Sequence, residues 1–294
     1  MKVLKVTPRG FCLGVVISIK MAKDTVKAYP DKKIYMIGLL VHNKIIVNEL
    51  EELGIIAIDD WKKSRLDIIK TIPKGSVVIF SAHGTDLKVL KVAEEQGLII
   101  VDTKCEWVLE TENIIKKYLN LGFDIVFIGK HSHPETIALT SLDNKKIHLV
   151  TNTQEVENLN ISNKDIFITN QTTLSIIDTD LIYKKIKEKY ENAIFKNDIC
   201  EATLVRQQAI LDLNPKEVDL LYVVGDERSN NTMKLVELAS DKGIKSIRIN
   251  RKEDIKINDL ENIDTVAVTA GASTSSIIQN QVIKYLEEIK NEIT

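Results

Sequence analysis

Strand-like runs alternate with amphipathic helical runs along the whole chain, and this alternation restricts the possible folds more than any other feature. Six apolar runs of strand length end in small or polar residues, at 34–38, 77–80, 125–129, 166–169, 220–225 and 266–269. Helices are expected at 14–28, 43–53, 87–96, 106–121, 175–189, 203–213, 232–242 and 275–290. Because strands separated by helices usually pair in parallel, the pattern predicts an α/β protein with mostly parallel strands.

Polar side chains follow these strands at their carboxyl ends, where open parallel sheets bind ligands and helix N-termini favour anions. The candidate binding residues are His42, His83, His133, Thr172, Ser229, Asn230, Asn231 and Ser273. One histidine in such a turn is more often structural. Three imidazoles, together with hydroxyl and amide groups, suit a polyanion such as a diphosphate.

The three cysteines of the chain are almost evenly spaced. Cys12, Cys105 and Cys200 lie 93 and 95 residues apart, each where a strand or turn meets a helix. Their even spacing predicts three similar modules, each with one cysteine. A helix N-terminus favours the thiolate form of cysteine, so each module is expected to give one ligand to a common centre. The expected modules are residues 1–100, 101–195 and 196–294. Zinc is the weaker alternative because CxxC pairs are absent, and three small buried hydrophobic side chains are another.

Glu135 follows Pro134 in a loop at a strand end. Its functional interpretation is a proton donor or relay beside the anion site, whereas a solvated loop carboxylate is the alternative. Thr172 lies in a similar place and either passes a proton, bonds a hydroxyl group or caps the following helix.

Charge and composition exclude several classes of function. The net charge is -2, which gives no electrostatic basis for binding nucleic acid or an anionic membrane. No apolar run reaches about 18 residues, and the N-terminal segment enters a strand without the layout of a signal peptide. Three widely spaced cysteines do not form a disulfide framework. We therefore expect a cytoplasmic protein without a transmembrane helix.

Taken together, these motifs resemble the LytB-type 4-hydroxy-3-methylbut-2-enyl diphosphate reductases of the non-mevalonate isoprenoid pathway. The resemblance extends from Pro8 to about Leu286. The matching stretches include Pro8-Arg9-Gly10-Phe11-Cys12, Val41-His42-Asn43, Ser81-Ala82-His83-Gly84, His133-Pro134-Glu135, Asn170-Gln171-Thr172-Thr173, Ile199-Cys200-Glu201 and Thr269-Ala270-Gly271-Ala272-Ser273. Each stretch is short, but their order and spacing are specific in combination.

The resemblance implies three α/β modules in a pseudo-threefold trefoil around a 4Fe–4S cluster. Cys12, Cys105 and Cys200 would each bind one iron and leave the fourth iron open to the substrate. Two electrons and two protons would then remove the hydroxyl of the allylic diphosphate as water, giving isopentenyl and dimethylallyl diphosphate. Glu135 would deliver protons and Thr172 would help to position the hydroxyl. The diphosphate would be held by His42, His83, His133, Ser229, Asn230, Asn231 and Ser273. A ferredoxin or flavodoxin would donate the electrons.

The chain departs from the family pattern at three places. Thr103-Lys104-Cys105-Glu106 replaces the usual Ala-Thr-Cys-Pro, Thr136-Ile137-Ala138-Leu139 is bulkier than usual, and Thr232-Met233 replaces a more polar pair. A lysine beside a thiolate stabilises negative charge and is expected to raise the cluster potential. The departures motivate an alternative, a divergent paralogue that binds a cluster and a diphosphate but senses redox state or a metabolite without turnover. A third alternative is a diphosphate-binding protein with structural cysteines and no metal.

Overall fold

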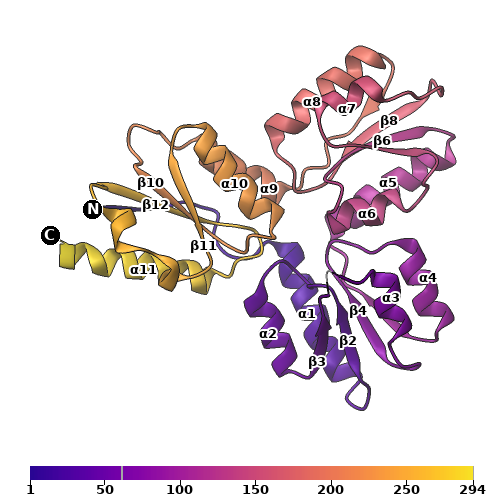
Figure 1. The fold of residues 1–294 in the computed structure, drawn as a ribbon, viewed down its shortest axis with the longest axis horizontal. Coiled ribbons are helices and arrows are strands. Elements are labelled where there is room, and N and C mark those ends of the chain that lie inside the picture. The colour runs from indigo at the N-terminus through magenta and orange to yellow at the C-terminus, as the bar shows by residue number, and fades with distance from the viewer. Residues whose placement is uncertain (61, 294) are drawn as a thin grey trace. The chain divides into compact units, whose positions relative to one another are not determined.

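The computed structural model describes residues 1–60 and 62–293 and contains three four-stranded parallel sheets, with side chains in the last helix described as far as Ile289 (Figure 1). The sheets and their connecting helices confirm the predicted α/β class and its three similar modules. The chain divides into two compact units, Gly14–Ile199 and the combination of Met1–Leu13 with Cys200–Thr294. The trefoil arrangement around a cluster stays a prediction.

The first sheet of the unit Gly14–Ile199 has the strand order β3-β2-β4-β5. Its strands are β2 (Ile34–Ile37), β3 (Ile55–Ile58), β4 (Val77–Phe80) and β5 (Ile99–Asp102). The accompanying helices are α1 (Leu13–Ala28), α2 (Lys44–Glu52), α3 (Arg65–Lys70) and α4 (Leu87–Glu95). All four residues of β4 are buried, because a central parallel strand is covered on both faces. Phe80 of β4 packs with Ile69 of α3 and Val89 of α4 in one apolar core.

The second sheet of this unit has the order β7-β6-β8-β9. Its strands are β6 (Asp124–Ile128), β7 (Ile147–Val150), β8 (Ile166–Asn170) and β9 (Ile194–Phe195). Its helices are α5 (Glu106–Asn120), α6 (Pro134–Thr140), α7 (Thr153–Asn158) and α8 (Ile176–Lys189). Successive residues of β6 enter opposite cores, since Phe127 packs with Ile115 of α5 and Ile128 packs with Ile182 of α8. The two cores hold the ends of β6 and β8 in place.

The sheet of the other unit has the order β1-β12-β10-β11. Its strands are β1 (Lys2–Lys5), β10 (Leu220–Val224), β11 (Lys245–Ile249) and β12 (Thr265–Ala270). Its helices are α9 (Glu201–Leu211), α10 (Asn230–Asp241) and α11 (Ser276–Ile293), with the short 3-10 turns η1 (Lys252–Asp254) and η2 (Ile257–Leu260). Tyr222 and Val268 lie in its apolar core.

Strand pairing differs from the predicted module boundaries at both ends of the first module. The N-terminal strand β1 pairs in parallel with β12, so the sheet of the C-terminal module begins with the first residues of the chain. Strand β5 crosses the expected boundary at residue 100 and pairs with β4. In this way β1 and β5 each form an edge of a four-stranded sheet. The remaining course of the boundaries stays a prediction.

The predicted elements correspond closely to the observed ones. The six predicted strands are β2, β4, β6, β8, β10 and β12, and the eight predicted helices occur with ends shifted by at most three residues. The short helices α3, α6 and α7 were not predicted. Within the described residues, no helix combines the length and apolar character that a membrane span requires.

Candidate functional site

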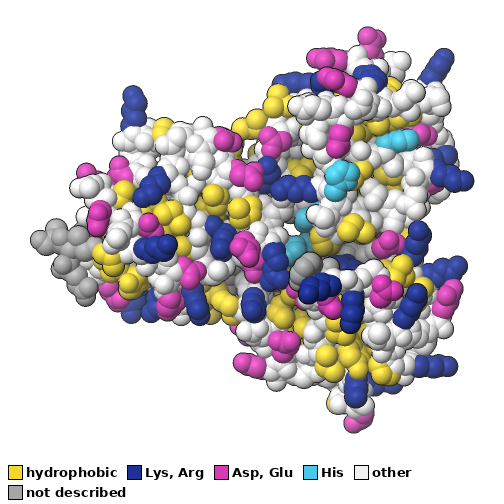
Figure 2. All heavy atoms as spheres, viewed as in Figure 1, with side chains coloured by type: hydrophobic (Ala, Val, Ile, Leu, Met, Phe, Trp, Pro, Cys, Tyr) yellow, Lys and Arg dark blue, Asp and Glu magenta, His cyan; other side chains and the backbone are white. Residues whose placement is uncertain are grey.

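Three imidazoles gather at the carboxyl ends of β2, β4 and β6. His42 and His83 have ring centroids 4.4 Å apart, and His133 lies 6.1 Å from the first and 5.5 Å from the second. One ring nitrogen from each histidine lies within 4.8 Å of the others. Such a group has the donors of an anion site and also the ligand set of a divalent metal centre. The structure thus brings together the three histidines that the sequence singled out, and histidine side chains are visible on the face shown in Figure 2.

Two imidazoles of this cluster, those of His83 and His133, are kept neutral. Burial lowers the pKa of His83 well below its ordinary value, and His42, His133 and Arg65 lower it further. Burial, followed by His42 and two cations, lowers the pKa of His133 to about 3. The Nδ1 atom of His83 is buried and has no hydrogen-bond partner among the described residues. Buried polar atoms usually have partners, so this nitrogen indicates a site for a ligand.

The position of His133 is set by its own helix. His133 is the N-cap of α6, and its Nδ1 accepts a hydrogen bond of 3.3 Å from the backbone N–H of Glu135. The proton of the neutral ring therefore lies on Nε2, which is left as a donor. His42 directly precedes Asn43, whose side chain caps α2 by accepting from the backbone N–H groups of Ile45 and Ile46. Both histidines thus stand at helix starts.

Two cations near the imidazoles were missed by the sequence interpretation. Arg65 and Lys130 both act on the pKa of His133. Arg65 begins α3, a helix that was not predicted, and its Nη1 donates a 3.4 Å hydrogen bond to the carbonyl oxygen of Gly84. Burial lowers the pKa of Arg65, with Asp59 acting in the opposite direction. The three histidines therefore have two cationic side chains near them, which the sequence interpretation did not include.

Glu135 lies in the first turn of α6 and is 1% exposed, so the alternative of a solvated loop carboxylate is wrong. Its Oε1 accepts a 2.7 Å hydrogen bond from the backbone N–H of Thr172, and its Oε2 accepts a 2.9 Å bond from the Thr172 hydroxyl. Burial raises the pKa of Glu135 to about 7, against the two hydrogen bonds from Thr172, which lower it. A carboxyl group with this pKa can donate a proton near neutral pH. Ser175, rather than Thr172, caps the following helix α8.

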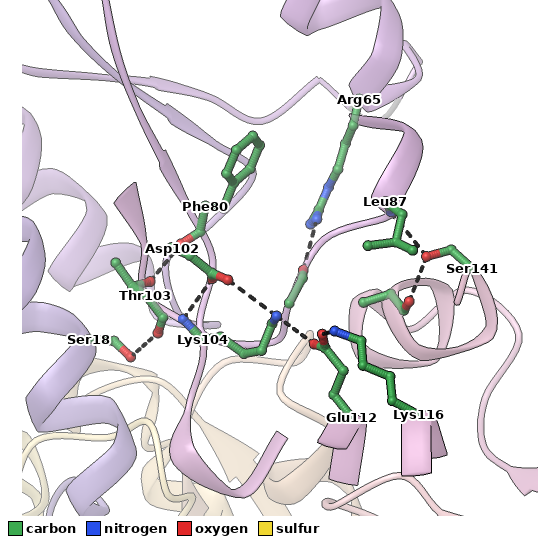
Figure 3. A network of polar contacts seen from close by, with 12 residues as sticks. Ser18, Arg65, Phe80, Leu87, Asp102, Thr103, Lys104, Glu112, Lys116 and Ser141 are labelled. Carbon is green, nitrogen blue, oxygen red and sulfur yellow. Dashed lines mark hydrogen bonds and ion pairs between the residues drawn. The ribbon is translucent and has the colours of Figure 1, made fainter. Parts of the chain in front are cut away.

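The loop that follows β5 carries Cys105, which is the N-cap of α5. Beside it, Nζ of Lys104 lies 2.6 Å from Oε2 of Glu112 and 3.2 Å from Oδ2 of Asp102 (Figure 3). Burial alone lowers the pKa of Lys104, but the hydrogen bonds and charges of Glu112 and Asp102 outweigh it, so the pKa lies above its ordinary value. Burial raises the pKa of Glu112, but the bonds from Lys104 and Lys116 leave it below normal. Both partners are therefore ionised.

Cys12 and Cys200 belong to the other unit. Cys12 directly precedes α1, and Cys200 is the N-cap of α9, where its Sγ lies 3.2 Å from the hydroxyl of Thr203. Burial lowers the pKa of Arg206, while both thiols act to raise it, so one guanidinium lies near two cysteines that are far apart in the sequence. Its Nη2 donates to the carbonyl of Gly10 at 2.7 Å, but its buried Nε has no partner among the described residues. A buried cation near two thiols fits thiolate ligands of an anionic iron–sulfur cluster.

The polar residues predicted at the ends of β10 and β12 also lie together in this unit. Ser229 is the N-cap of α10, and the hydroxyl groups of Ser273 and Ser229 lie 3.5 Å apart. Asn231 donates to the hydroxyl of Thr203 at 3.2 Å and accepts from the backbone N–H of Ala272 at 2.9 Å. It therefore connects the helix of Cys200 to the turn after β12. Asn230 is the first residue of α10 and is buried.

Thr232, one of the departures from the family pattern, packs against the turn after β12. A Cβ atom on Gly271 would lie 2.0 Å from Oγ1 of Thr232, so only glycine fits at this turn beside this threonine. Thr136, another departure, is buried and donates a 3.2 Å hydrogen bond to Oε1 of Gln171. Both threonines thus support loops with site residues and do not replace any of those residues.

Comparison with known proteins finds one family. The profile of the family described as LytB protein matches residues 3–287. A curated protein of Malacoplasma penetrans, named 4-hydroxy-3-methylbut-2-enyl diphosphate reductase, is 46% identical over 98% of this chain and 98% of its own. One of the same name from Bacillus subtilis is 40% identical over 99% of this chain and 92% of its own. The structure of the E-1-hydroxy-2-methyl-but-2-enyl-4-diphosphate reductase from Plasmodium falciparum is similar with a TM-score of 0.89 and 28% identity, covering 100% of this chain and 99% of that one.

Proposed function

This chain belongs to the LytB protein family, and we propose that it reduces 4-hydroxy-3-methylbut-2-enyl diphosphate, removing its hydroxyl group to give isopentenyl and dimethylallyl diphosphate. The observation that carries the proposal is the pair of groups in the unit Gly14–Ile199. A cluster of three imidazole groups suits an anion, and Glu135, whose backbone N–H is bonded to His133, has a pKa of about 7. These neighbouring groups support the proposal of a diphosphate site with a proton donor beside it.

The proposed cofactor is a 4Fe–4S cluster bound by Cys12, Cys105 and Cys200. When bound, the cluster would supply electrons to the substrate. The position of each cysteine at the start of a helix supports the assignment, because a helix N-terminus stabilises thiolate. Arg206 supports it further by adding a buried positive charge near two of the thiols.

The proposed role of the imidazoles is to bind the diphosphate. His133 offers an Nε2 donor, and His83 has a buried nitrogen with no partner among the described residues. A diphosphate favours the protonated form of a histidine, so binding would draw protons onto rings that are neutral in its absence. Ser229, Asn230, Asn231 and Ser273 stay proposed as further donors to the diphosphate.

Glu135 is the proposed proton donor. Its carboxyl group is held by two hydrogen bonds from Thr172, so its orientation does not depend on substrate. Its pKa of about 7 means that both protonation states are populated near neutral pH, and it can give a proton and regain one in each turnover. Thr172 positions this carboxyl group, and its proposed contact with the substrate hydroxyl is the second part of its role.

The electron donor is proposed to be a small one-electron carrier of the ferredoxin or flavodoxin type. On the face shown in Figure 2, acidic and basic side chains are interspersed, and no field of one sign dominates it. Charge on this face therefore does not identify a docking site.

The test is anaerobic reconstitution followed by turnover. Purified protein should bind about one 4Fe–4S cluster and, with a strong one-electron reductant, convert the substrate to both products. Iron and sulfide analysis and product detection by mass spectrometry measure the two parts. A colourless, iron-free protein after reconstitution would refute the proposed cofactor. A normal cluster without turnover, and without rescue of a strain that lacks the reductase, would favour the non-catalytic paralogue.

A further inference from the structure

Two neighbouring loops carry a proposed cluster ligand and a proposed diphosphate ligand. Strands β4 and β5 pair in parallel with Phe80 opposite Asp102, so the loops that follow them leave the sheet side by side. The backbone N–H of Cys105 donates a 2.9 Å hydrogen bond to the carbonyl of Ala82, the residue before His83. The Thr103 hydroxyl donates a second bond, of 2.6 Å, to the carbonyl of Phe80. The backbones of the two loops are thus bonded to each other.

The side chain of Lys104 contacts Asp102 and Glu112 (Figure 3) and also packs against Gly84 in the loop after β4. Its side chain is 10% exposed, and its Nζ contacts Asp102 on one side of Cys105 and Glu112 on the other. Its aliphatic chain covers the Gly84 turn, because a Cβ atom on Gly84 would lie 3.3 Å from Cε of Lys104. Gly84 has a φ of +88°, in the region that favours glycine, so the turn can accept the lysine this closely.

Arg65 holds the same turn from its other side. Its Nη1 donates to the carbonyl oxygen of Gly84 at 3.4 Å. The stem of one partly buried lysine and the guanidinium of one partly buried arginine therefore both contact the Gly84 turn. A shift of Lys104 changes the packing of this turn, and with it the position of His83.

We propose that Lys104 is a positioning residue that couples Cys105 to His83, so that occupation of the cluster site and binding of diphosphate strengthen each other. The inference rests on the proposed function, in which Cys105 binds the cluster and His83 binds the diphosphate. Coupling between two ligands is reciprocal, so a cluster that holds the Cys105 loop favours the binding geometry at His83. Bound diphosphate then raises the affinity of the site for the cluster by the same factor, and we expect iron to be lost more slowly as a result.

Lys116 provides a matched control. It contacts the other oxygen of Glu112, Oε1, at 2.5 Å, and its side chain is 49% exposed. It carries the same charge as Lys104 and shares the same carboxylate, but no hydrogen bond or ion pair joins it to either loop among the described residues. Substituting Lys104 and Lys116 separately therefore distinguishes loop positioning from the general stability of α5.

The experiment compares cluster-loaded wild type, Lys104→Met, Lys104→Arg and Lys116→Met, with inorganic diphosphate as the probe. Calorimetry gives the dissociation constant, and transfer of iron to a chelator, with and without diphosphate, gives the protection. In wild type, diphosphate should slow the loss of iron. In Lys104→Met the dissociation constant should rise about fivefold or more and the protection should disappear. Lys104→Arg should restore most of both effects, and Lys116→Met should match wild type.

An unchanged dissociation constant and unchanged protection in Lys104→Met would overturn the inference, as would an equal loss in Lys116→Met. If Lys104→Met does not fold, Glu112→Gln takes its place, because it weakens the hold on Lys104 while keeping the lysine. Protection equal to wild type in that variant counts against the coupling. A wild type that turns over normally while these results fail would refute only the inference. A wild type that binds no iron would refute the proposed function as well.

Discussion

Replacing Glu135 by glutamine tests the proposed chemistry most directly. The change keeps the shape of the side chain and removes its proton. The amide oxygen still accepts from the backbone N–H of Thr172, and the Thr172 hydroxyl, which donates to Oε2 in the wild type, can rotate to accept from the amide nitrogen. The fold and the cluster should therefore persist. The lost function is that of a general acid, which contributes about 10²–10⁴ in rate.

The size and sign of the accompanying pH effects follow from burial. Glu135 is 1% exposed and its pKa lies at about 7. The active form is the protonated one, so wild-type kcat should be high below pH 7 and fall as the pH rises through about 7. The pKa of Glu135 in the folded protein lies above the ordinary value of 4.5. The free energy of unfolding should therefore decrease as the pH rises from about 4.5 to about 7, by roughly 3 kcal/mol in total. Glu135→Gln should lack both pH dependences.

The assay is kcat between pH 5.5 and 9, together with iron content and urea unfolding at pH 5 and 8. We expect Glu135→Gln to retain the cluster, to lose about hundredfold in kcat, and to be at least as stable as wild type at pH 8. Glu157→Gln, which changes an exposed carboxylate paired with Lys185, is the control and should keep the wild-type profile. A kcat within twofold of wild type in Glu135→Gln would remove this residue from the mechanism.

Three further predictions concern the same sites. Diphosphate binding should take up protons, because His83 and His133 are neutral beforehand and an anion favours imidazolium. The affinity for diphosphate should therefore fall as the pH rises. Calorimetry in two buffers measures the proton uptake, which should be smaller for His133→Gln. Thr172→Val should move the fall of kcat to higher pH, because the Thr172 hydroxyl bond lowers the pKa of Glu135 and its removal should raise that pKa. An unchanged pH profile of kcat would contradict this role of Thr172. Arg206→Met should lower the midpoint potential of the cluster in a redox titration, because it removes a buried positive charge near Cys12 and Cys200, and an equal or higher potential would disprove the assignment.

The central strands could be predicted because of how they are buried. Each sheet has two inner strands covered on both faces, and these read as continuous apolar runs such as Val77–Phe80 and Leu220–Val224. The edge strands are less buried, as in Lys245–Ile249, whose sequence is mixed, although the N-terminal strand was expected and is observed at Lys2–Lys5. Helices of six or seven residues, such as α3, are too short to show a helical period. Their absence from the prediction also concealed Arg65.

The sequence likewise indicated which site residues lie at strand ends and which lie at helix starts. Parallel strands expose their carboxyl ends at one edge of a sheet, so His42, His83 and His133 were expected in comparable places, and each cysteine was expected at a helix start. Those expectations depend only on local alternation of strand and helix. They did not specify which strand ends would approach one another.

The amino-acid sequence by itself determined the α/β class, the inner strands, the helix starts of the cysteines and the family. Only the tertiary structure decided that β1 joins β12, that Arg65 lies by the imidazoles, and that Lys104 packs against the Gly84 turn. It also decided the pKa of Glu135, which is raised by burial among residues distant in the chain. Periodicity and turn chemistry are local and can be read along a sequence. Burial and charge pairing depend on which segments meet, and only the folded chain brings those segments together.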